Sequence, residues 1–288
     1  MKVLVTGGSG FLGRRTAAYL RSLGWQVMTP SHGEVDITRE HEIRAWFYEN
    51  RPEAVIHTAA ISDTGRCQRE PAWSEEINVG GAVKLAGACA EMGAKLLFCS
   101  SDQVYCESDI PGPPRESEVL RPNNVYARQK LRAEEACLRI LPETVCLRLS
   151  WMYACCDIPG DHGHFLAALR QSLQEDGPIR WPIHDRRGLT DVEDVVKNLP
   201  KALELPGGAW NFGAENDVST YDTVKAVLEA LGMRAALGRL QPNEEAFAEH
   251  PRDITMDLAH LRSAGISFPT TREGLCRALD KMGTSGEN

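Results

Sequence analysis

The sequence predicts an α/β protein, a Rossmann-like doubly wound parallel sheet followed by a smaller C-terminal lobe on the substrate side. Short apolar runs alternate with helical patterns through the first 150 residues, and this alternation is typical of parallel strands joined by crossover helices. A glycine-rich turn directly follows the first run. From residue 151 the alternation becomes irregular and the loops lengthen, which indicates a second, smaller region.

The first half contains five apolar runs that we expect to be strands of one sheet. They are KVLVT, QVMTP, EAVIHTA, KLLFCSS and TVCLRLS, which begin at residues 2, 26, 53, 95 and 144. Between them the apolar spacing predicts helices over residues 11–23, 39–50, 71–92 and 125–141. Each crossover returns the chain to a parallel neighbour, so we expect residues 1–150 to form one domain.

The second half, residues 151–288, is expected to form the lobe that binds substrate. Helical patterns cover residues 164–175, 192–204 and 221–231. The run AWNFG at residues 209–213 is a candidate strand that returns to the sheet. The lobe is therefore expected to be partly interleaved with the first domain.

Composition and charge narrow the classes of partner. The formal net charge of -8 and the pI near 5.6 argue against a nucleic-acid surface, because phosphate binding needs clustered lysine and arginine. Small molecules are the expected partners. None of the nine cysteines forms a CxxC pair, no signal peptide is evident and no apolar run approaches the length of a membrane span. We expect a cytoplasmic protein with reduced thiols and no membrane contact.

The turn after the first strand has the spacing GxxGxxG and opens an amphipathic helix. Glycines allow a tight turn and the close approach of a pyrophosphate, and a helix N-terminus offers free amides to phosphate. This context predicts that residues 1–150 bind NAD(P). The expected cofactor contacts in this turn are Gly7, Ser9, Gly10, Phe11, Leu12, Gly13 and Arg14.

The end of the second strand bears on the choice between NADH and NADPH. An acidic residue there would hydrogen-bond the ribose hydroxyls of NAD, but the run ends TPSH, with Ser31 and His32. We expect Ser31 to contact the cofactor. Arg14 or Arg15 could help to bind a 2'-phosphate, although both could equally be solvated helix positions. The sequence therefore favours NADPH over NADH.

Tyr126 and Lys130 lie four residues apart at the start of a predicted helix, so they share one face. The strand KLLFCSS ends at Ser100 and Ser101, and ligands of parallel α/β sheets bind at this carboxyl edge. With the glycine turn, these residues resemble the extended short-chain dehydrogenase/reductase superfamily. The narrower resemblance is to the dTDP-4-dehydrorhamnose reductase group, carried in order by SSDQVY, NVYARQK, LRLSWMY, TDVEDVV and PRDITMDLAHL.

The resemblance implies that Ser101, Tyr126 and Lys130 are catalytic and that Asn78 supports them. A phenol with an ordinary pKa near 10 is a poor acid or base at neutral pH, and a cationic lysine beside it favours the phenolate. Tyr126 would then protonate a carbonyl oxygen as hydride arrives. Ser101 would hydrogen-bond the same oxygen, and Lys130 would also reach the nicotinamide ribose.

The resemblance also suggests further cofactor contacts. His57, Ala59 and Ala60 end the third strand, where the family lines its cofactor cleft, although His57 could equally be a buried histidine bonded within the fold. Asp36 and Ile37 resemble the adenine contact of the family. A carboxylate that caps the following helix is the alternative for Asp36.

Five residues are candidate substrate contacts, and three sequence features depart from the group's pattern. Gln103 replaces a common aromatic residue, His250 replaces an arginine, and no proline precedes Thr190. These differences lie on the substrate side. The candidate substrate contacts are Asp102, Gln103, Arg148, Trp151 and Arg252.

A metal site is not expected. Asp157, Asp161, His162 and His164 are close in sequence, but they lack a recognised ligand spacing.

The leading hypothesis is an NAD(P)H-dependent reductase of a keto group, most concretely the 4-keto group of a nucleotide-activated deoxysugar. One alternative is a nucleotide-sugar epimerase or dehydratase that retains tightly bound NAD. Another is a regulatory subunit that binds NADP without turnover. Dimers are common among such enzymes, although no interface is evident in the sequence.

Overall fold

The computed structural model describes residues 1–106, 112–156, 158–161 and 163–284. Six strands of this part form one parallel sheet in the order β10-β5-β4-β3-β1-β2. The predicted doubly wound parallel sheet is confirmed. The strands are β1 (Lys2–Thr6), β2 (Gln26–Met28), β3 (Ala54–His57), β4 (Lys95–Ser101), β5 (Val145–Leu149) and β10 (Gly208–Phe212).

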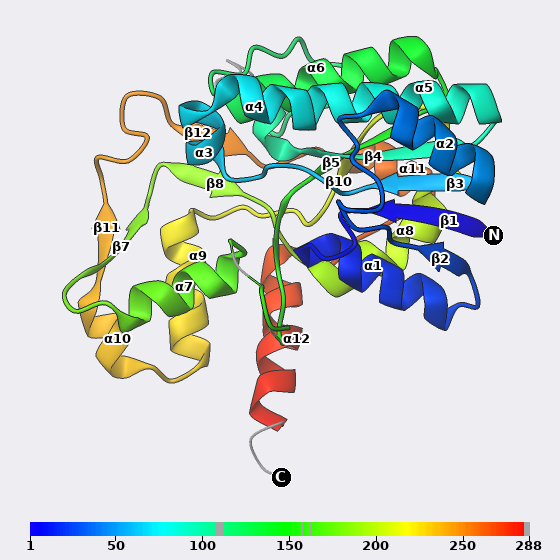
Figure 1. Cartoon of the computed structure of the whole chain (residues 1–288). Coiled ribbons are helices and arrows are strands. Elements are labelled where there is room, and N and C mark those ends of the chain that lie inside the picture. The colour runs from blue at the N-terminus through cyan, green and yellow to red at the C-terminus, as the bar shows by residue number, and fades with distance from the viewer. Residues whose placement is uncertain (107–111, 157, 162, 285–288) are drawn as a thin grey trace.

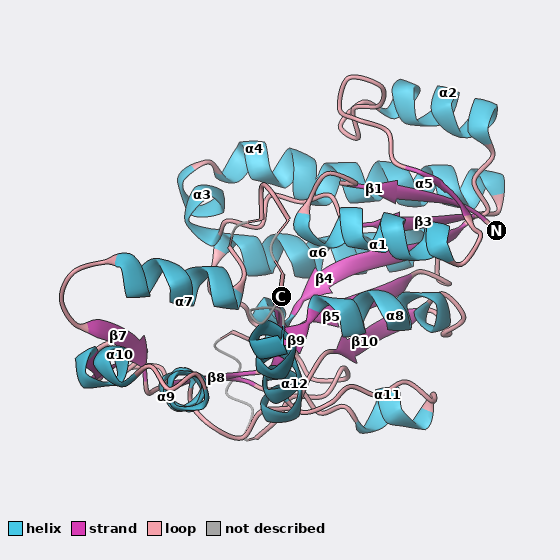
Figure 2. Cartoon of the chain, turned by 90° about the horizontal axis from the view of Figure 1, so that it is seen from below, coloured by secondary structure: helices cyan, strands magenta, loops and turns pink. Residues whose placement is uncertain are grey.

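Helices cover both faces of the sheet (Figures 1 and 2). On one face lie α2 (Glu40–Asn50), α5 (Ala82–Met92) and α6 (Val125–Ile140), whose apolar side chains pack with those of the strands. On the other face lie α1 (Phe11–Ser22) and α8 (Val192–Ala202). The two cores fix the strands, and therefore fix where each strand ends.

The strand order determines where a ligand can bind. From β1 the chain moves to one side to form β2 and then crosses to the other side to form β3. Ligands of open α/β sheets bind in the crevice at the carboxyl ends of the strands, where the order reverses. In this chain that crevice lies beyond Thr6 and His57.

One predicted helix is interrupted. The pattern over residues 71–92 is divided into α4 (Pro71–Glu75), a π-helical turn (Glu76–Gly81) and α5. A π turn adds one residue to the helix and often marks a functional position, and apolar periodicity does not reveal it. A short helix that the sequence did not predict, α3 (Thr64–Arg69), precedes α4.

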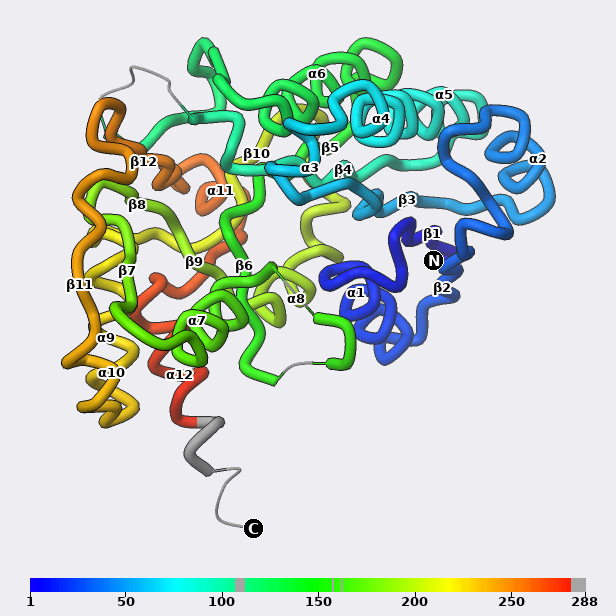
Figure 3. The backbone as a smooth tube through the Cα atoms, turned by 60° about the vertical axis from the view of Figure 1, so that its left-hand side comes forward, coloured from blue at the N-terminus to red at the C-terminus, as the bar shows by residue number. Residues whose placement is uncertain are grey.

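Among its described residues, the second half adds three two-stranded parallel pairs beside the sheet (Figure 3). Each strand has three or four residues, which is too short for a periodic pattern to predict. The expected return to the sheet is confirmed, since β10 pairs with β5. The pairs are β6 (Trp151–Tyr153) with β9 (Leu189–Asp191), β7 (Ile179–Pro182) with β11 (Leu240–Asn243), and β8 (Asp185–Arg187) with β12 (Arg252–Ile254).

The second lobe has its own apolar core, which includes Tyr153, Phe165, Trp181 and Leu228. This core holds the short strands in place next to the carboxyl edge of the large sheet. The lobe's helices are α7 (Phe165–Gln174), α9 (Thr220–Ala230), α10 (Arg234–Arg239) and α12 (Thr271–Thr284), and α11 (Ala259–Ser263) packs beside β10.

Candidate active site

The glycine turn joins β1 to α1 beside the end of β3. A Cβ on Gly7, whose φ is +67°, would lie 2.8 Å from the backbone nitrogen of Ala59. A Cβ on Gly13 would lie 2.2 Å from the Gly7 carbonyl oxygen. The N-cap of α1 is Gly10, and no side chain in the described part of the protein caps it. Since uncapped helical amides attract phosphate oxygens, this turn fits the pyrophosphate of a dinucleotide.

The other residues predicted around this turn have different environments. Ser9 is exposed, whereas the Leu12 side chain packs into the core. Phe11 is half-buried, and its ring stacks on His164 at a centroid distance of 5.0 Å. Phe11 therefore connects the first turn of α1 with the segment that precedes α7.

His57 is a buried histidine bonded within the fold, which was the alternative to a contact with the cofactor. Its side chain is 1% exposed, and Nδ1 lies 2.7 Å from Thr6 Oγ1. Burial, helped by the nearby Lys130 cation, lowers the pKa of His57 to about 3. The imidazole is therefore neutral, and its contacts lie within the fold.

Asp36 also makes local contacts. Its Oδ1 accepts hydrogen bonds from Thr38 N at 2.9 Å and from Thr38 Oγ1 at 2.7 Å, and these bonds lower the pKa of the carboxyl. Ile37 is buried in the core. The adenine contacts proposed for both residues stay predictions. The helix-cap alternative for Asp36 is wrong, because α2 begins at Glu40 with Arg39 as its N-cap, and Asp36 instead closes a local turn with Thr38.

A carboxylate lies close to the end of β2, although the run TPSH itself contains none. Glu34 folds back onto Ser31, and its Oε2 accepts hydrogen bonds from Ser31 N and Ser31 Oγ, both at 2.7 Å. The inference that no carboxylate lies here is therefore wrong. Three residues beyond Ser31 in sequence, Glu34 is brought close by a tight turn closed through the Ser31 carbonyl.

Arg14 and Arg15 both bind Asp161 in the segment that follows β6. Arg14 donates to Asp161 Oδ1 at 2.5 Å, and Arg15 donates to Asp161 Oδ2 at 2.5 Å. Burial opposes ionisation of Asp161, but the hydrogen bond from Arg15, the backbone bond from Ile158 and the two positive charges lower its pKa to about 2. The predicted contact of Arg14 with a cofactor phosphate would have to compete with this pair.

The predicted catalytic residues lie on β4 and α6. Ser101 ends β4, and Tyr126 and Lys130 lie on the first turns of α6, whose N-cap Asn124 accepts a hydrogen bond from Ala127 N at 2.9 Å. Lys130 Nζ is 5.8 Å from the centre of the Tyr126 ring and donates to the Cys99 carbonyl at 2.8 Å. All three side chains are buried or nearly so. They therefore face one small volume at the carboxyl edge of the sheet.

Burial shifts the pKa values of both Tyr126 and Lys130 in this volume. Burial raises the pKa of Tyr126, and hydrogen bonding with Ser101 acts in the opposite direction. Burial also lowers the pKa of Lys130 to about 8. The expectation of a lowered phenol pKa is therefore wrong, because burial dominates at Tyr126. Tyr126 is protonated at neutral pH, which is the form that can donate a proton.

Asn78 lies in the π-helical turn, not in a regular helix. Its side chain accepts from Ile61 N at 2.8 Å, donates to the Ile61 carbonyl at 3.1 Å and donates to Gln129 Oε1 at 2.9 Å. Gln129 lies next to Lys130 on α6. Asn78 thus fixes the loop after β3 against the catalytic helix.

Asp102 has a partner that the sequence did not identify. Its Oδ1 accepts from Ser101 Oγ at 3.1 Å, and its Oδ2 accepts from an Arg187 terminal nitrogen at 2.7 Å. The Arg187 guanidinium carbon lies 5.0 Å from the centre of the Trp151 ring. The only signal was the alternation of Asp185 and Arg187 in HDRRG, because period-two residues share a strand face.

Gln103 and Arg252, two of the predicted substrate contacts, lie near Asp102. Gln103 Oε1 accepts from the Cys106 thiol at 3.1 Å. Arg252 Nε donates to Asp185 Oδ1 at 2.7 Å, and its guanidinium covers the Phe247 ring. The β8–β12 pair thus presents two arginines toward the short helix that follows Ser101.

Arg148 is held inside the fold. It lies on β5, donates three hydrogen bonds to the Glu134 carboxylate at 2.8 to 3.2 Å and donates to the Tyr105 hydroxyl at 2.7 Å. Its remaining contact is the Glu116 carbonyl at 3.3 Å. All three guanidinium nitrogens have protein partners, so the geometry favours a structural role over the predicted substrate contact.

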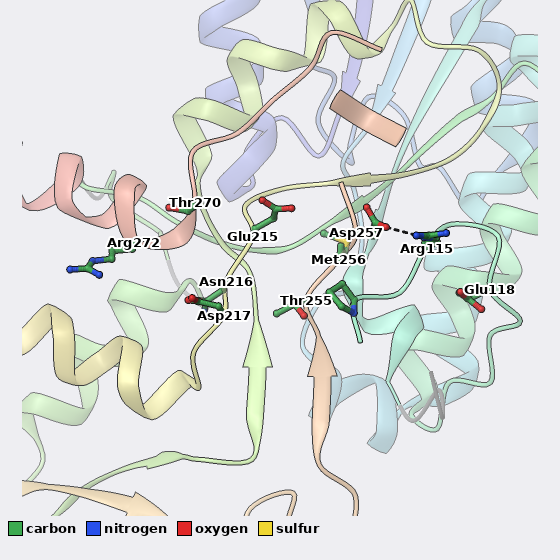
Figure 4. Close-up of a pocket in the computed structure, with 11 residues that line it drawn as sticks. Arg115, Glu118, Glu215, Asn216, Asp217, Thr255, Met256, Asp257, Thr270 and Arg272 are labelled. Carbon is green, nitrogen blue, oxygen red and sulfur yellow. Dashed lines mark hydrogen bonds and ion pairs between the residues drawn. The ribbon is translucent and has the colours of Figure 1, made fainter. Parts of the chain in front are cut away.

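A separate cavity of about 740 Å³ opens between the loops that follow β10 and β12 and the start of α12 (Figure 4). The ion pair between Arg115 and Asp257, at 2.9 Å, lies on its wall. Ser101, Tyr126 and Lys130 do not line it. Its lining is Pro113, Arg115, Glu118, Glu215, Asn216, Asp217, Thr255, Met256, Asp257, Thr270 and Arg272.

The described part of the chain contains no group of three or more His, Cys, Asp or Glu side chains that could hold a metal ion. Asp157 and His162 lie outside the described residues. None of the described helices combines the length and apolar character needed to cross a membrane.

Comparisons with known proteins identify the family of the chain. A family model described as the RmlD substrate binding domain matches residues 1–284. A dTDP-4-dehydrorhamnose reductase from Streptomyces griseus is 37% identical over 279 residues, which cover 91% of this chain and 88% of that protein. A dTDP-4-keto-6-deoxy-D-glucose reductase from Streptomyces niveus is 34% identical over 243 residues, which cover 83% of this chain and 81% of that protein.

The fold is also found in a solved structure. The crystal structure of dTDP-4-dehydrorhamnose reductase from Bacillus anthracis in complex with NADP is 24% identical and has a TM-score of 0.85. The match covers 97% of this chain and 99% of that one.

Proposed function

The chain belongs to the RmlD substrate-binding-domain family of the extended short-chain dehydrogenase/reductases, and from this premise we propose that it reduces a keto group with NAD(P)H. The resemblance carried by the sequence motifs is thereby confirmed, and the chain is an oxidoreductase. The observation that supports the proposal is that Ser101, Tyr126 and Lys130 share one buried volume at the carboxyl edge of the sheet, the same edge at which the glycine turn follows β1.

The side chains divide the work of a carbonyl reduction. The bound cofactor would supply hydride from its reduced nicotinamide. Tyr126, kept protonated by burial, donates its proton to the substrate oxygen. Ser101 hydrogen-bonds the same oxygen and stabilises the negative charge that develops there. The Lys130 cation lowers the free energy of the tyrosinate that remains.

We propose a nucleotide-activated deoxysugar with a 4-keto group as substrate. The two Streptomyces relatives, both more than 30% identical, are named as reductases of such sugars. Asp102 accepts a hydrogen bond from Ser101, and Trp151 packs on Arg187, the partner of Asp102; these two residues are the proposed substrate contacts. NADPH is the proposed cofactor, held by Gly7, Gly10 and Gly13, and NADH is the alternative that the Glu34 carboxylate makes worth testing.

The test is consumption of NADPH by the purified chain in the presence of a panel of 4-keto nucleotide sugars. We expect turnover with at least one of them and none without sugar. Absence of turnover across the panel would contradict the proposal. Stoichiometric NAD retained through purification would instead indicate the epimerase or dehydratase. Cofactor binding without any turnover would indicate the regulatory subunit.

A further inference from the structure

The Asp102 carboxylate connects Arg187 to the catalytic serine. Its two oxygens have different partners, Ser101 Oγ at 3.1 Å and the Arg187 guanidinium at 2.7 Å. The carboxylate side chain is 1% exposed and the arginine side chain 9% exposed. Solvent therefore screens this pair weakly, and each charge depends on the other.

The negative charge of this carboxylate opposes the charge that develops during the reaction. When a carbonyl is reduced, negative charge develops on its oxygen and then on Tyr126, next to Ser101. An ionised carboxylate in the same buried volume opposes both changes, and Asp102 does raise the pKa of Tyr126. A cation on the far side of Asp102 offsets this repulsion without contacting the substrate oxygen.

The contacts of Arg187 fit a cation that compensates the charge of Asp102. Its guanidinium packs on Trp151, and only one of its nitrogens is paired with Asp102. Its Nε is buried and has no hydrogen-bond partner within the described part of the molecule. By contrast, all three guanidinium nitrogens of Arg148 donate to protein groups.

We propose that Arg187 is a positioning residue for the reduction: it holds the Asp102 carboxylate on Ser101 and offsets its negative charge beside the reacting oxygen. This inference rests on the proposed function and deepens it. The groups that face Tyr126 from the surrounding elements are Asp102, Cys99 on β4, Lys130 on α6 and Cys67 on α3. Of these, Asp102 is the anion, because burial raises the pKa of both thiols.

The test compares pH profiles of NADPH-dependent ketone reduction for four proteins. They are the wild type, Arg187→Met, Arg187→Lys and the double variant Arg187→Met with Asp102→Asn. Without the compensating cation, the kcat of Arg187→Met falls by about 10- to 100-fold, and its alkaline limb moves to higher pH. Arg187→Lys keeps the wild-type limb because it keeps the charge. In the double variant the limb returns toward wild type and kcat recovers relative to Arg187→Met.

The matched control is Arg186→Met, whose side chain is exposed on the other face of β8. It should retain the wild-type profile. If Arg187→Met changes only thermal stability, or raises KM alone, and Asp102→Asn restores nothing, the inference is wrong while the reductase stands. If the wild type itself turns over no ketone, the proposed function fails and the inference fails with it.

Discussion

Two buried arginine–carboxylate pairs lie near the carboxyl edge of the sheet, and they differ in what surrounds them. Arg148 and Glu134 join β5 to α6, and every nitrogen of Arg148 is bound by the protein. Arg187 and Asp102 join β8 to the segment after Ser101, and Arg187 retains an unpartnered nitrogen within the described structure. The first pair fixes the sheet against its helix, and the second acts on the site.

The difference shows that burial of a charge does not by itself identify chemistry. Both arginines are less than 10% exposed. What separates them is the neighbour of the carboxylate: Glu134, on α6, accepts a hydrogen bond from Ser100, whereas Asp102 accepts one from Ser101. Ser100 and Ser101 are consecutive on β4, so their side chains point to opposite faces of the sheet. The two arginine–carboxylate pairs therefore have different roles.

The largest expected effect is on the structural pair. Arg148→Met leaves Glu134 buried without its cation, and we expect the free energy of unfolding to fall by about 3–5 kcal/mol. Urea denaturation of the variant and of Arg139→Met, an exposed control on α6, measures it. A folded Arg148→Met with normal stability and a raised KM would instead restore the predicted substrate role.

Lys130→Met separates activity from stability in the site itself. We expect reductase activity to fall by about 100-fold or more, while the free energy of unfolding at pH 7 rises by about 1–2 kcal/mol because a buried cation is removed. The Cys99 carbonyl loses a donor, which limits the gain. Thermal melts and turnover are compared with those of the exposed Lys225→Met.

The pH dependence of wild-type stability follows the same cause. Burial lowers the pKa of Lys130 from 10.5 to about 8, so between these values the folded chain binds fewer protons than the unfolded chain. The Lys130 contribution therefore makes stability rise with pH across this window. Lys130→Met should lose that rise. An identical pH dependence in wild type and variant would contradict the assignment.

Asp161 tests how the first turns of α1 are held to the second lobe. Asp161→Asn weakens both arginine pairs, and we expect a loss of about 1–3 kcal/mol in unfolding free energy. Because the pKa of Asp161 is lowered to about 2, its contribution is present above the ordinary value near 4 and is lost only as pH falls through about 2. The exposed Asp217→Asn is the control. Equal denaturation midpoints for the two variants would contradict the prediction.

The smallest expected effect concerns cofactor choice. Glu34→Gln removes a negative charge held on Ser31, and we expect the ratio of NADPH to NADH affinity to rise by about five-fold. Fluorescence titration with both cofactors measures the ratio. Glu49→Gln, exposed on α2, should not change it. An unchanged ratio in Glu34→Gln would place the 2'-phosphate away from this turn.

The sequence predicted the fold of the first half well because its signals are local. The glycine spacing, the strand runs and the Tyr126–Lys130 interval each lie within a few residues, and backbone geometry converts such spacing directly into position. The helix that carries Tyr126 and Lys130 begins at Val125, as predicted, and the structure adds its N-cap, Asn124. The π turn at Asn78 was missed because one extra residue leaves the apolar pattern intact.

The substrate side could not be predicted to the same depth. Arg187 reaches Asp102 across 85 positions of sequence, and Arg252 reaches Asp185 across 67. Strands of three residues carry no periodicity, so neither pairing nor facing could be inferred. The sequence led us to predict Arg148 as a substrate contact and not to identify Arg187, because tertiary packing decides which carboxylate faces each arginine. Glu34 was missed because its turn folds back over only three residues.

NADPH consumption by the wild type and by Tyr126→Phe, with the same 4-keto nucleotide sugar, tests whether Tyr126 donates the proton. We expect turnover by the wild type and a loss of about 100- to 10,000-fold in the variant, with cofactor affinity little changed. Equal turnover by the two proteins would mean that the phenol does not donate the proton, and would contradict the site described here.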